Sequence, residues 1–195
     1  MSLCERDGSA PPLRVLYGLW AVHITRSNRE AVEALLPRFQ DLAASGDPVA
    51  LLTAHANAGV YAFFSGDFER CLQQMTEATQ WYATVEHSEF LRRHGYGGGL
   101  YPFAWRMWAL SILGCSDQAT AAGKELQALA EQARNPYGQA IATGYLINLA
   151  RDRRDAKHTL ELAEQQIEYT RRQMLPFWEG PAHCSRGWAR VCMRL

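Results

Sequence analysis

The stretch that decides the fold runs from residue 47 to residue 84 and reads DPVALLTAHANAGVYAFFSGDFERCLQQMTEATQWYAT. Its first part, residues 49–64, is apolar nearly all round, which is typical of a helix that is covered on most sides. The apolar residues of the second part recur at the spacing of one helical face: Phe68, Cys71, Leu72, Met75, Ala78 and Tyr82. The stretch therefore predicts a helix pair in which only the second helix shows a face to water.

The same pair recurs along the chain with a period of about forty residues. One register contains these residues, with steps of 40, 48, 40 and 40: Trp20, Val60, Trp108, Asn148 and Trp188. Gly66 and Gly114 are likewise 48 residues apart, and each closes an apolar run. We interpret this as a forty-residue unit with one insertion of eight residues, and residues 86–99 hold four glycines that break helical periodicity.

Residues at the expected helix ends support these boundaries. Proline is tolerated in a first helical turn, and this position is expected for Pro48, Pro136 and Pro176. Side chains expected to cap second helices belong to Asp67, Ser116 and Asp155. Inside the first helices, Gly59 and Gly187 are expected where two helices pack closely, because a helical glycine needs such a compensation.

Together these patterns predict an all-α fold, a right-handed α-solenoid of stacked antiparallel helix pairs with repeats of about 40 residues. We expect residues 1–12 to be disordered or extended. Residues 13–195 are expected to form a single helical-repeat domain of about four and a half helix pairs, with a long loop at 86–99. Without a following partner, the last helix would leave an apolar face open, so a homodimer through the C-terminal end is also an expectation.

Composition and motifs argue against most specific chemistries. The formal net charge is zero, so neither nucleic acid nor an anionic membrane is an expected partner. The five cysteines form no CxxC pair and no apolar leader is present, which favours a cytoplasmic protein. The chain has no GxxxxGK[ST], GxSxG or HExxH motif, and its His and Cys residues lack the spacing of a zinc site. We therefore expect no catalysis, no cofactor and no metal.

Three segments resemble the C-terminal repeat region of large bacterial signalling ATPases, which are often fused to adenylate or guanylate cyclase domains. They are GDPVALLTAHANAGVYAFFSGDFERCL, RRHGYGGGLYPFAWRMWALSILGCSDQA and LPFWEGPAHCSRGWA. Those repeats are similar to lengthened tetratricopeptide repeats. The resemblance covers about residues 15–194 and implies a fragment of a larger signal-transduction regulator.

If first helices line a groove as in tetratricopeptide repeats, the resemblance implies these groove residues: Trp20, His23, Phe63, Phe64, Tyr101 and Trp108. Tryptophan and tyrosine are favoured binding anchors, although the same residues also fit core packing, and the sequence leaves both interpretations open. The expected function is a non-catalytic scaffold or sensor that binds a protein or peptide. The alternative is a module that binds a small molecule in an aromatic-lined groove.

Overall fold

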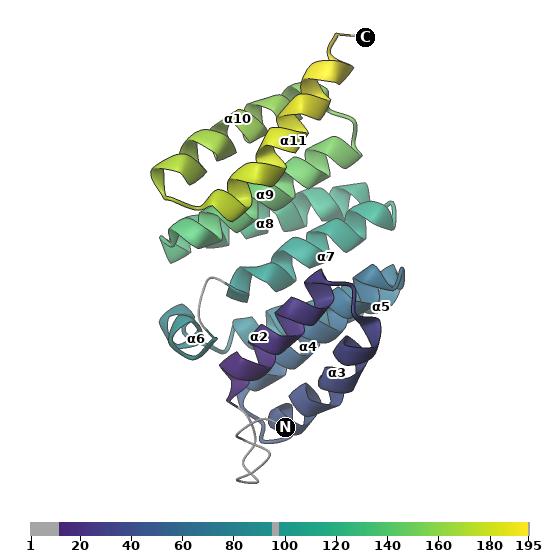
Figure 1. Cartoon of the computed structure of the whole chain (residues 1–195), viewed down its shortest axis with the longest axis vertical. Coiled ribbons are helices and arrows are strands. Elements are labelled where there is room, and N and C mark those ends of the chain that lie inside the picture. Colours follow the sequence, from purple (N-terminus) through teal and green to yellow (C-terminus); the bar gives the residue numbers. More distant parts are fainter. Residues whose placement is uncertain (1–11, 95–97, 195) are drawn as a thin grey trace. The chain divides into compact units, whose positions relative to one another are not determined.

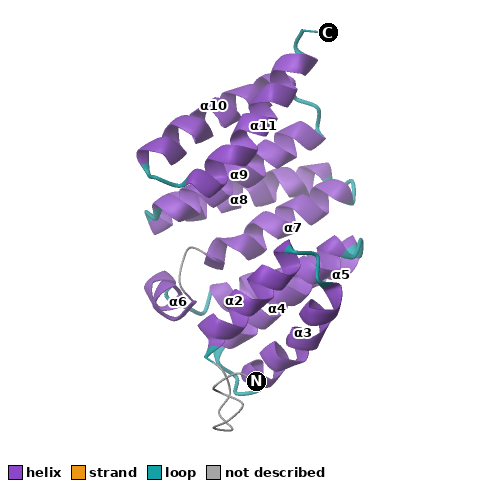
Figure 2. Cartoon of the chain, in the orientation of Figure 1, coloured by secondary structure: helices purple, strands orange, loops and turns teal. Residues whose placement is uncertain are grey.

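The computed structural model describes residues 12–94 and 98–194, and all of their regular secondary structure is helical (Figures 1 and 2). This confirms the all-α fold for the described residues. The expected disordered or extended segment lies outside them, except for Pro12, which precedes the first described helix. None of the described helices is long and apolar enough to cross a membrane.

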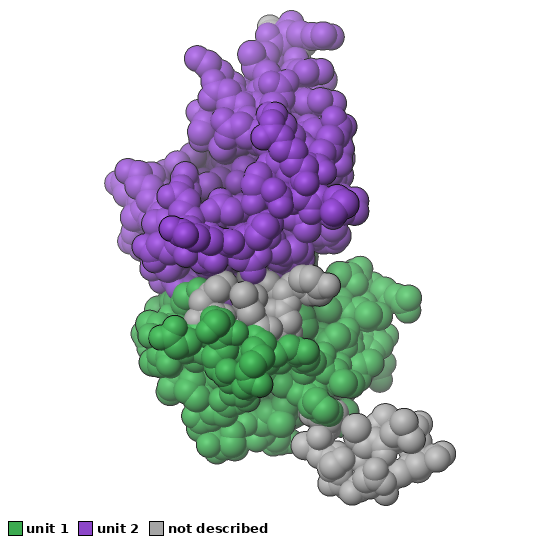
Figure 3. Space-filling model, turned by 90° about the vertical axis from the view of Figure 1, so that its left-hand side faces the viewer, with its two compact units in different colours: residues 1–95 green, residues 96–195 purple. Residues whose placement is uncertain are grey.

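The chain divides into two compact units, residues 1–95 and 96–195 (Figure 3), whereas the sequence favoured one domain over residues 13–195. Unit 1 contains α2 (Leu13–Thr25), α3 (Arg29–Ala43), α4 (Pro48–Phe64), α5 (Phe68–Tyr82) and α6 (His87–His94). Unit 2 contains η1 (Gly98–Leu100), α7 (Tyr101–Ile112), α8 (Ser116–Ala133), α9 (Pro136–Asp152), α10 (Ala156–Arg172) and α11 (Pro176–Cys192). Within each unit, consecutive helices pack against each other, except that α6 packs mainly against α2 and α4 rather than against α5.

The forty-residue unit appears directly in the turns that join first to second helices. Ser27, Gly66, Gly114 and Arg154 occupy this turn and have φ values of 54°, 80°, 79° and 58°. In each turn, the backbone N–H of the residue after the left-handed one donates a hydrogen bond to the carbonyl oxygen five residues before it. Asp67 donates in this way to Ala62 at 2.9 Å, and Asp155 donates to Ala150 at 3.0 Å. This left-handed turn satisfies carbonyls that the helix end leaves unpaired. Gly66 and Gly114, which are 48 residues apart, therefore occupy turns of the same conformation.

Most of the expected helix boundaries are confirmed. Pro48, Pro136 and Pro176 each lie in a first helical turn. Asp67 and Asp155 accept hydrogen bonds from the backbone N–H groups of Arg70 and His158, both at 3.0 Å. The prediction that Ser116 caps α8 is wrong. Cys115 holds the N-cap position and makes no side-chain bond there, because α8 begins at Ser116, one residue earlier than we expected.

Gly59 lies where α4 and α5 pack closely, as predicted, since an added Cβ would lie 2.7 Å from Met75 Cε. The same prediction is wrong for Gly187 on α11, where an added Cβ would meet nothing within 4 Å. First helices therefore do not all use their glycines for packing.

The region expected as a long loop contains α6. Phe90 on this short helix is fully buried and packs with Val49 and Leu52 of α4. Arg93 adds an ion pair with Asp47, and its Nη1 lies 2.7 Å from Asp47 Oδ1. The buried ring, the ion pair and a hydrogen bond from Arg14 Nε to the Arg93 carbonyl oxygen at 2.9 Å thus hold a helix that is too short to show periodicity in the sequence. The glycine-rich residues 95–97 lie outside the described residues.

Candidate functional site

The six residues predicted to line a groove are divided between the two units. Trp20 and His23 lie on α2 and Phe63 and Phe64 on α4, whereas Tyr101 and Trp108 lie on α7. Trp20 is only 5% exposed and stacks on Tyr17 with ring centroids 5.8 Å apart. Its placement corrects the expectation that this indole lines a groove, because the ring is part of the core.

Phe63 and Phe64 lie at the end of α4, where the chain turns into α5. The ring of Phe63 is half-buried and makes edge contacts with Phe64 at 5.8 Å and Phe68 at 5.2 Å. Phe64 is 64% exposed. His23 is half-buried on α2. The exposed ring of Phe64 therefore lies at the edge of a small group of rings that includes the half-buried Phe63 and Phe68.

Seven aromatic rings of unit 2 form one network, which we call the aromatic cluster. Its members come from α7, α9 and α11: Tyr101, Trp105, Trp108, Tyr137, Tyr145, Phe177 and Trp178. Tyr145 is the centre of the network, with ring centroids 5.4 Å from Trp105, 5.8 Å from Trp108 and 6.3 Å from Tyr101. The structure thus brings the two predicted residues of this unit together through a ring that the sequence reasoning missed.

A signal for the missing rings was present in the sequence. Trp105 and Tyr145 each lie three residues before a position of the forty-residue register, namely Trp108 and Asn148. Residues three apart share a helical face, so rings at these paired positions meet when first helices pack side by side. The rule could have found the centre of the cluster.

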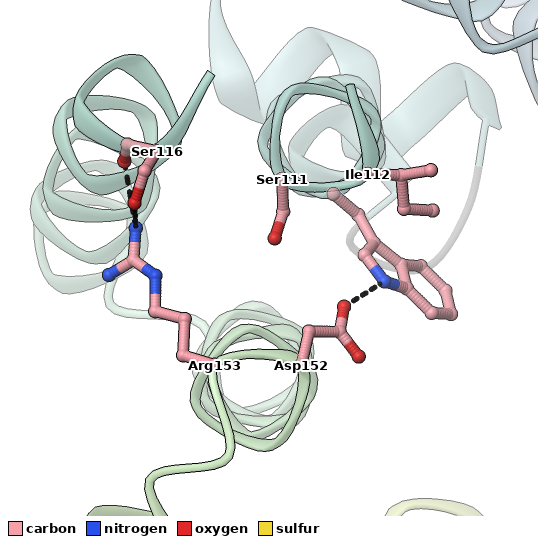
Figure 4. A pocket seen from close by; sticks show the side chains of 6 residues that line it. Ser111, Ile112, Ser116, Asp152 and Arg153 are labelled. Atoms are coloured by element: carbon pink, nitrogen blue, oxygen red, sulfur yellow. Dashed lines mark hydrogen bonds between the residues drawn. The ribbon is translucent and has the colours of Figure 1, made fainter. Parts of the chain in front are cut away.

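Beside the cluster lies an open pocket of about 410 Å³, which we call the α7–α9 pocket (Figure 4). Its lining consists of Trp108, Ser111, Ile112, Ser116, Asp152 and Arg153. These residues come from the end of α7, the start of α8 and the end of α9. The left-handed turns at Gly114 and Arg154 reverse the chain here, so they bring helix ends with polar side chains to one place.

Two sets of hydrogen bonds fix the polar walls of the α7–α9 pocket. Trp108 Nε1 donates to Asp152 Oδ2 at 2.8 Å, and this bond holds the indole against the carboxylate. On the other wall, Arg153 Nη2 donates to the Ser116 carbonyl oxygen at 2.8 Å and to Thr120 Oγ1 at 2.7 Å. Figure 4 shows the Ser111 hydroxyl directed into the space between these two walls.

The pocket retains hydrogen-bonding capacity beyond these contacts. Asp152 Oδ1 and the Nε and Nη1 groups of Arg153 make no hydrogen bond to the described residues. Ile112, 43% exposed, adds apolar surface beside the indole. An acceptor, several donors and an apolar wall are the groups that a peptide backbone and side chain require. The lining contains neither histidine nor cysteine.

No protein-family model matches the sequence, and no curated protein matches it.

Proposed function

We propose that this protein is a non-catalytic interaction scaffold that binds a peptide segment of a protein partner at the α7–α9 pocket. The observation that supports this proposal best is the bond between Trp108 Nε1 and Asp152 Oδ2 at 2.8 Å. It orients an indole at the wall of an open pocket, in contact with the aromatic cluster through Tyr145. A preoriented tryptophan offers a large apolar contact and loses little side-chain freedom on binding.

The two polar walls would set the direction of the bound peptide. Arg153 offers unpaired N–H donors on the side of Ser116, and Asp152 offers an acceptor oxygen on the side of Trp108. A peptide unit carries one acceptor and one donor, so it can bridge the walls in one orientation. An acidic side chain near Arg153 and a basic one near Asp152 would strengthen this complex and make it sensitive to salt.

The wider architecture is part of the same proposal. Helix pairs that repeat every forty residues would continue as a right-handed superhelix, as in tetratricopeptide repeats, whose surfaces bind extended segments. The resemblance to bacterial signalling ATPases would make the chain the partner-sensing part of a larger cytoplasmic regulator.

One observation favours a second candidate, a small-molecule sensor. A volume of about 410 Å³ falls within the range of about 300–1,000 Å³ found for ligand pockets. Such pockets are mostly enclosed, whereas this pocket is open and four of its six lining residues have hydroxyl, carboxylate or guanidinium groups. We therefore rank peptide binding first.

The test is a selection of random twelve-residue peptides on the immobilised protein, followed by titration of the selected peptides with fluorescence anisotropy. Trp108→Ala and Arg153→Gln should each weaken binding at least tenfold. The matched control is Arg172→Gln, which removes a guanidinium paired with Glu168 on the exposed face of α10. Circular dichroism should show that the folded fraction is unchanged.

Trp108→Phe refines the test, because it keeps a smaller ring in the aromatic cluster and removes the N–H group that donates to Asp152. We expect a smaller loss than for Trp108→Ala. If selected peptides bind Trp108→Ala and Arg153→Gln as tightly as the unaltered protein, the α7–α9 pocket is not the binding site. If no peptide is selected while a small-molecule library yields ligands sensitive to both substitutions, the second candidate replaces the first.

A further inference from the structure

Helix α6 (His87–His94) is attached to unit 1 by fewer buried side chains than the longer helices of that unit. α2, α3, α4 and α5 each bury at least two residues. Among the α6 side chains that the structure describes, only that of Phe90 is buried. The others are exposed or half-buried: Ser88, Glu89, Arg92 and Arg93. One side chain therefore provides the buried apolar contact of α6.

Phe90 lies in an apolar site that other parts of unit 1 provide, which we call the α6 site. The ring is buried together with Val49 and Leu52 of α4. Partly buried apolar residues from α2, from α5 and from the segment after α5 pack against this group: Leu13, Trp81, Tyr82 and Val85. None of these lining side chains is charged, so the α6 site has the chemistry of a pocket for an aromatic ring.

Arg93 makes a polar contact on the same side of α6 as Phe90. It follows Phe90 by three residues, and residues three apart share a helical face. Its Nη1 donates to Asp47 Oδ1 at 2.7 Å, and its Nη2 pairs with Asp47 Oδ2. Arg14 of α2 donates to the carbonyl oxygens of Arg92 and Arg93, the latter at 2.9 Å, and so satisfies carbonyl groups at the end of α6. Unit 1 thus recognises a ring, a guanidinium and the last carbonyl groups of a short helix.

The same contacts allow α6 to open while the rest of unit 1 stays folded. α6 has 8 residues, and isolated helices shorter than about 12–15 residues are marginal in water. Segments with few buried apolar contacts open at a lower free energy than the whole domain unfolds. The pair of Arg93 with Asp47 adds little, because its side chains are 34% and 25% exposed and are screened by water and salt. The packing of α2 on α3, α3 on α4 and α4 on α5 does not involve α6, so it remains when α6 opens.

We infer that α6 is a displaceable internal ligand of the α6 site, and that a short helix of a partner protein competes with it. The occupant in the structure defines the partner's chemistry, which is an aromatic residue followed three residues later by arginine. The partner's ring takes the place of Phe90 beside Val49 and Leu52, and its arginine pairs with Asp47. The α6 site belongs to unit 1 and does not depend on the peptide binding proposed for unit 2.

Tethering explains why α6 occupies its site in the free protein. Residues 83–86 join α5 to α6, and a short linker gives a tethered segment an effective concentration on the order of millimolar. A separate peptide at micromolar concentration competes poorly against this. Removing the ring of Phe90 abolishes the internal competition and leaves the lining of the α6 site in place. The variant Phe90→Ala should therefore bind the segment in trans.

The experiment measures binding of a fluorescent peptide of residues 86–94, EHSEFLRRH, to the full-length protein by anisotropy. Phe90→Ala should bind it at least about tenfold more tightly than the unaltered protein does, because the tethered ring no longer competes. The matched control is Phe64→Ala, which removes an aromatic ring that is 64% exposed on the same α4 and should leave peptide binding unchanged. A peptide whose phenylalanine is replaced by alanine should bind neither variant.

Asp47 provides a second check on the recognition. Adding Asp47→Asn to Phe90→Ala should weaken peptide binding, because the charge that pairs with the peptide's second arginine is lost. Asparagine is also a good N-cap, so α4 should keep its start. Hydrogen exchange of the unaltered protein tests the opening itself, without any substitution. The backbone amides of α6 should exchange at least about a hundredfold faster than those of α4.

Three results would overturn the inference. If the amides of α6 exchange as slowly as those of α4, the helix does not open separately; this measurement also decides the matter when Phe90→Ala does not fold. If Phe90→Ala retains its helical circular dichroism but binds the peptide no better than the unaltered protein, the α6 site does not accept a helix in trans. If the unaltered protein is a dimer that Phe90→Ala dissociates, the occupant is α6 of a second copy and the assignment to a partner protein is wrong.

Discussion

Gly144 in the middle of α9 supports the sharpest prediction about packing. An added Cβ at this position would lie 2.7 Å from Cζ3 and 2.9 Å from Cε3 of Trp178. Carbon atoms in contact are normally about 3.5–4.0 Å apart, so the indole would have to move by roughly 0.8 Å. Trp178 is buried and contacts Tyr137 and Tyr145, with ring centroids 6.2 and 6.3 Å apart. A rigid ring held on these sides has little room to move.

The size of the effect of Gly144→Ala follows from two opposing contributions. Overpacking in a core costs about 1–3 kcal/mol. Replacing a helical glycine by alanine contributes about 0.5–1 kcal/mol in the other direction. We expect a net loss of about 1 kcal/mol, which corresponds to a melting temperature lower by about 2–4 °C for a chain of this size.

Thermal unfolding followed by far-ultraviolet circular dichroism measures this loss, and Gly18→Ala is the control. Gly18 also lies inside a first helix, but its added Cβ would meet nothing within 4 Å, so this variant should be more stable than the unaltered protein. In a Trp178→Leu background, Gly144→Ala should lose its cost and become stabilising, because the clash is removed. The reasoning is refuted if Gly144→Ala raises stability in the unaltered background as much as Gly18→Ala does.

Three further predictions concern turns, thiols and acid. Arg154 adopts a left-handed φ of 58° at a turn position that is occupied by glycine in the equivalent turns at Gly66 and Gly114. Arg154→Gly should therefore stabilise the protein by about 1 kcal/mol, and Gly114→Ala should destabilise it by a similar amount. Urea unfolding would detect both changes in the free energy of unfolding. Burial raises the pKa of the Cys71 thiol to about 12 from its usual value of 9.0. At pH 8 a thiol reagent should therefore label the exposed Cys184 and Cys192 rapidly, and Cys71 only after unfolding. Rapid labelling of Cys71 in the native protein would contradict the structure. The Arg93 guanidinium beside Asp47 holds the pKa of that carboxyl below its ordinary value, so the ion pair contributes its full stability above about pH 4 and loses it as the pH falls through the lowered pKa. Asp47→Asn should accordingly make the free energy of unfolding fall less steeply as the pH is lowered. If the variant and the unaltered protein show the same dependence of stability on pH, the ion pair is not linked to folding.

The sequence by itself determined the helical repeat. Apolar spacing over residues 68–84, the positions of Pro48, Pro136 and Pro176, and the two glycines 48 residues apart are local features, and each acts within one helix or one turn. Local propensity and capping depend on residues a few positions apart, so a reader of the sequence can evaluate them without the fold.

Tertiary structure alone decided the positions that depend on distant neighbours. Part of the segment expected to be a loop forms α6, because the side chain of Phe90 packs in the core of unit 1 beside Val49 and Leu52. Trp20 is part of the core, although the register treated it like Trp108, which lines the α7–α9 pocket. Gly187 is on the surface, although the register treated it like Gly59. Whether a residue at a given register position is covered depends on which helices lie against it, and that arrangement is fixed by packing between segments far apart in the chain. The α7–α9 pocket has the same origin. Trp108 and Asp152 are 44 residues apart, and only the two left-handed turns and the packing of first helices bring the indole N–H within 2.8 Å of the carboxylate.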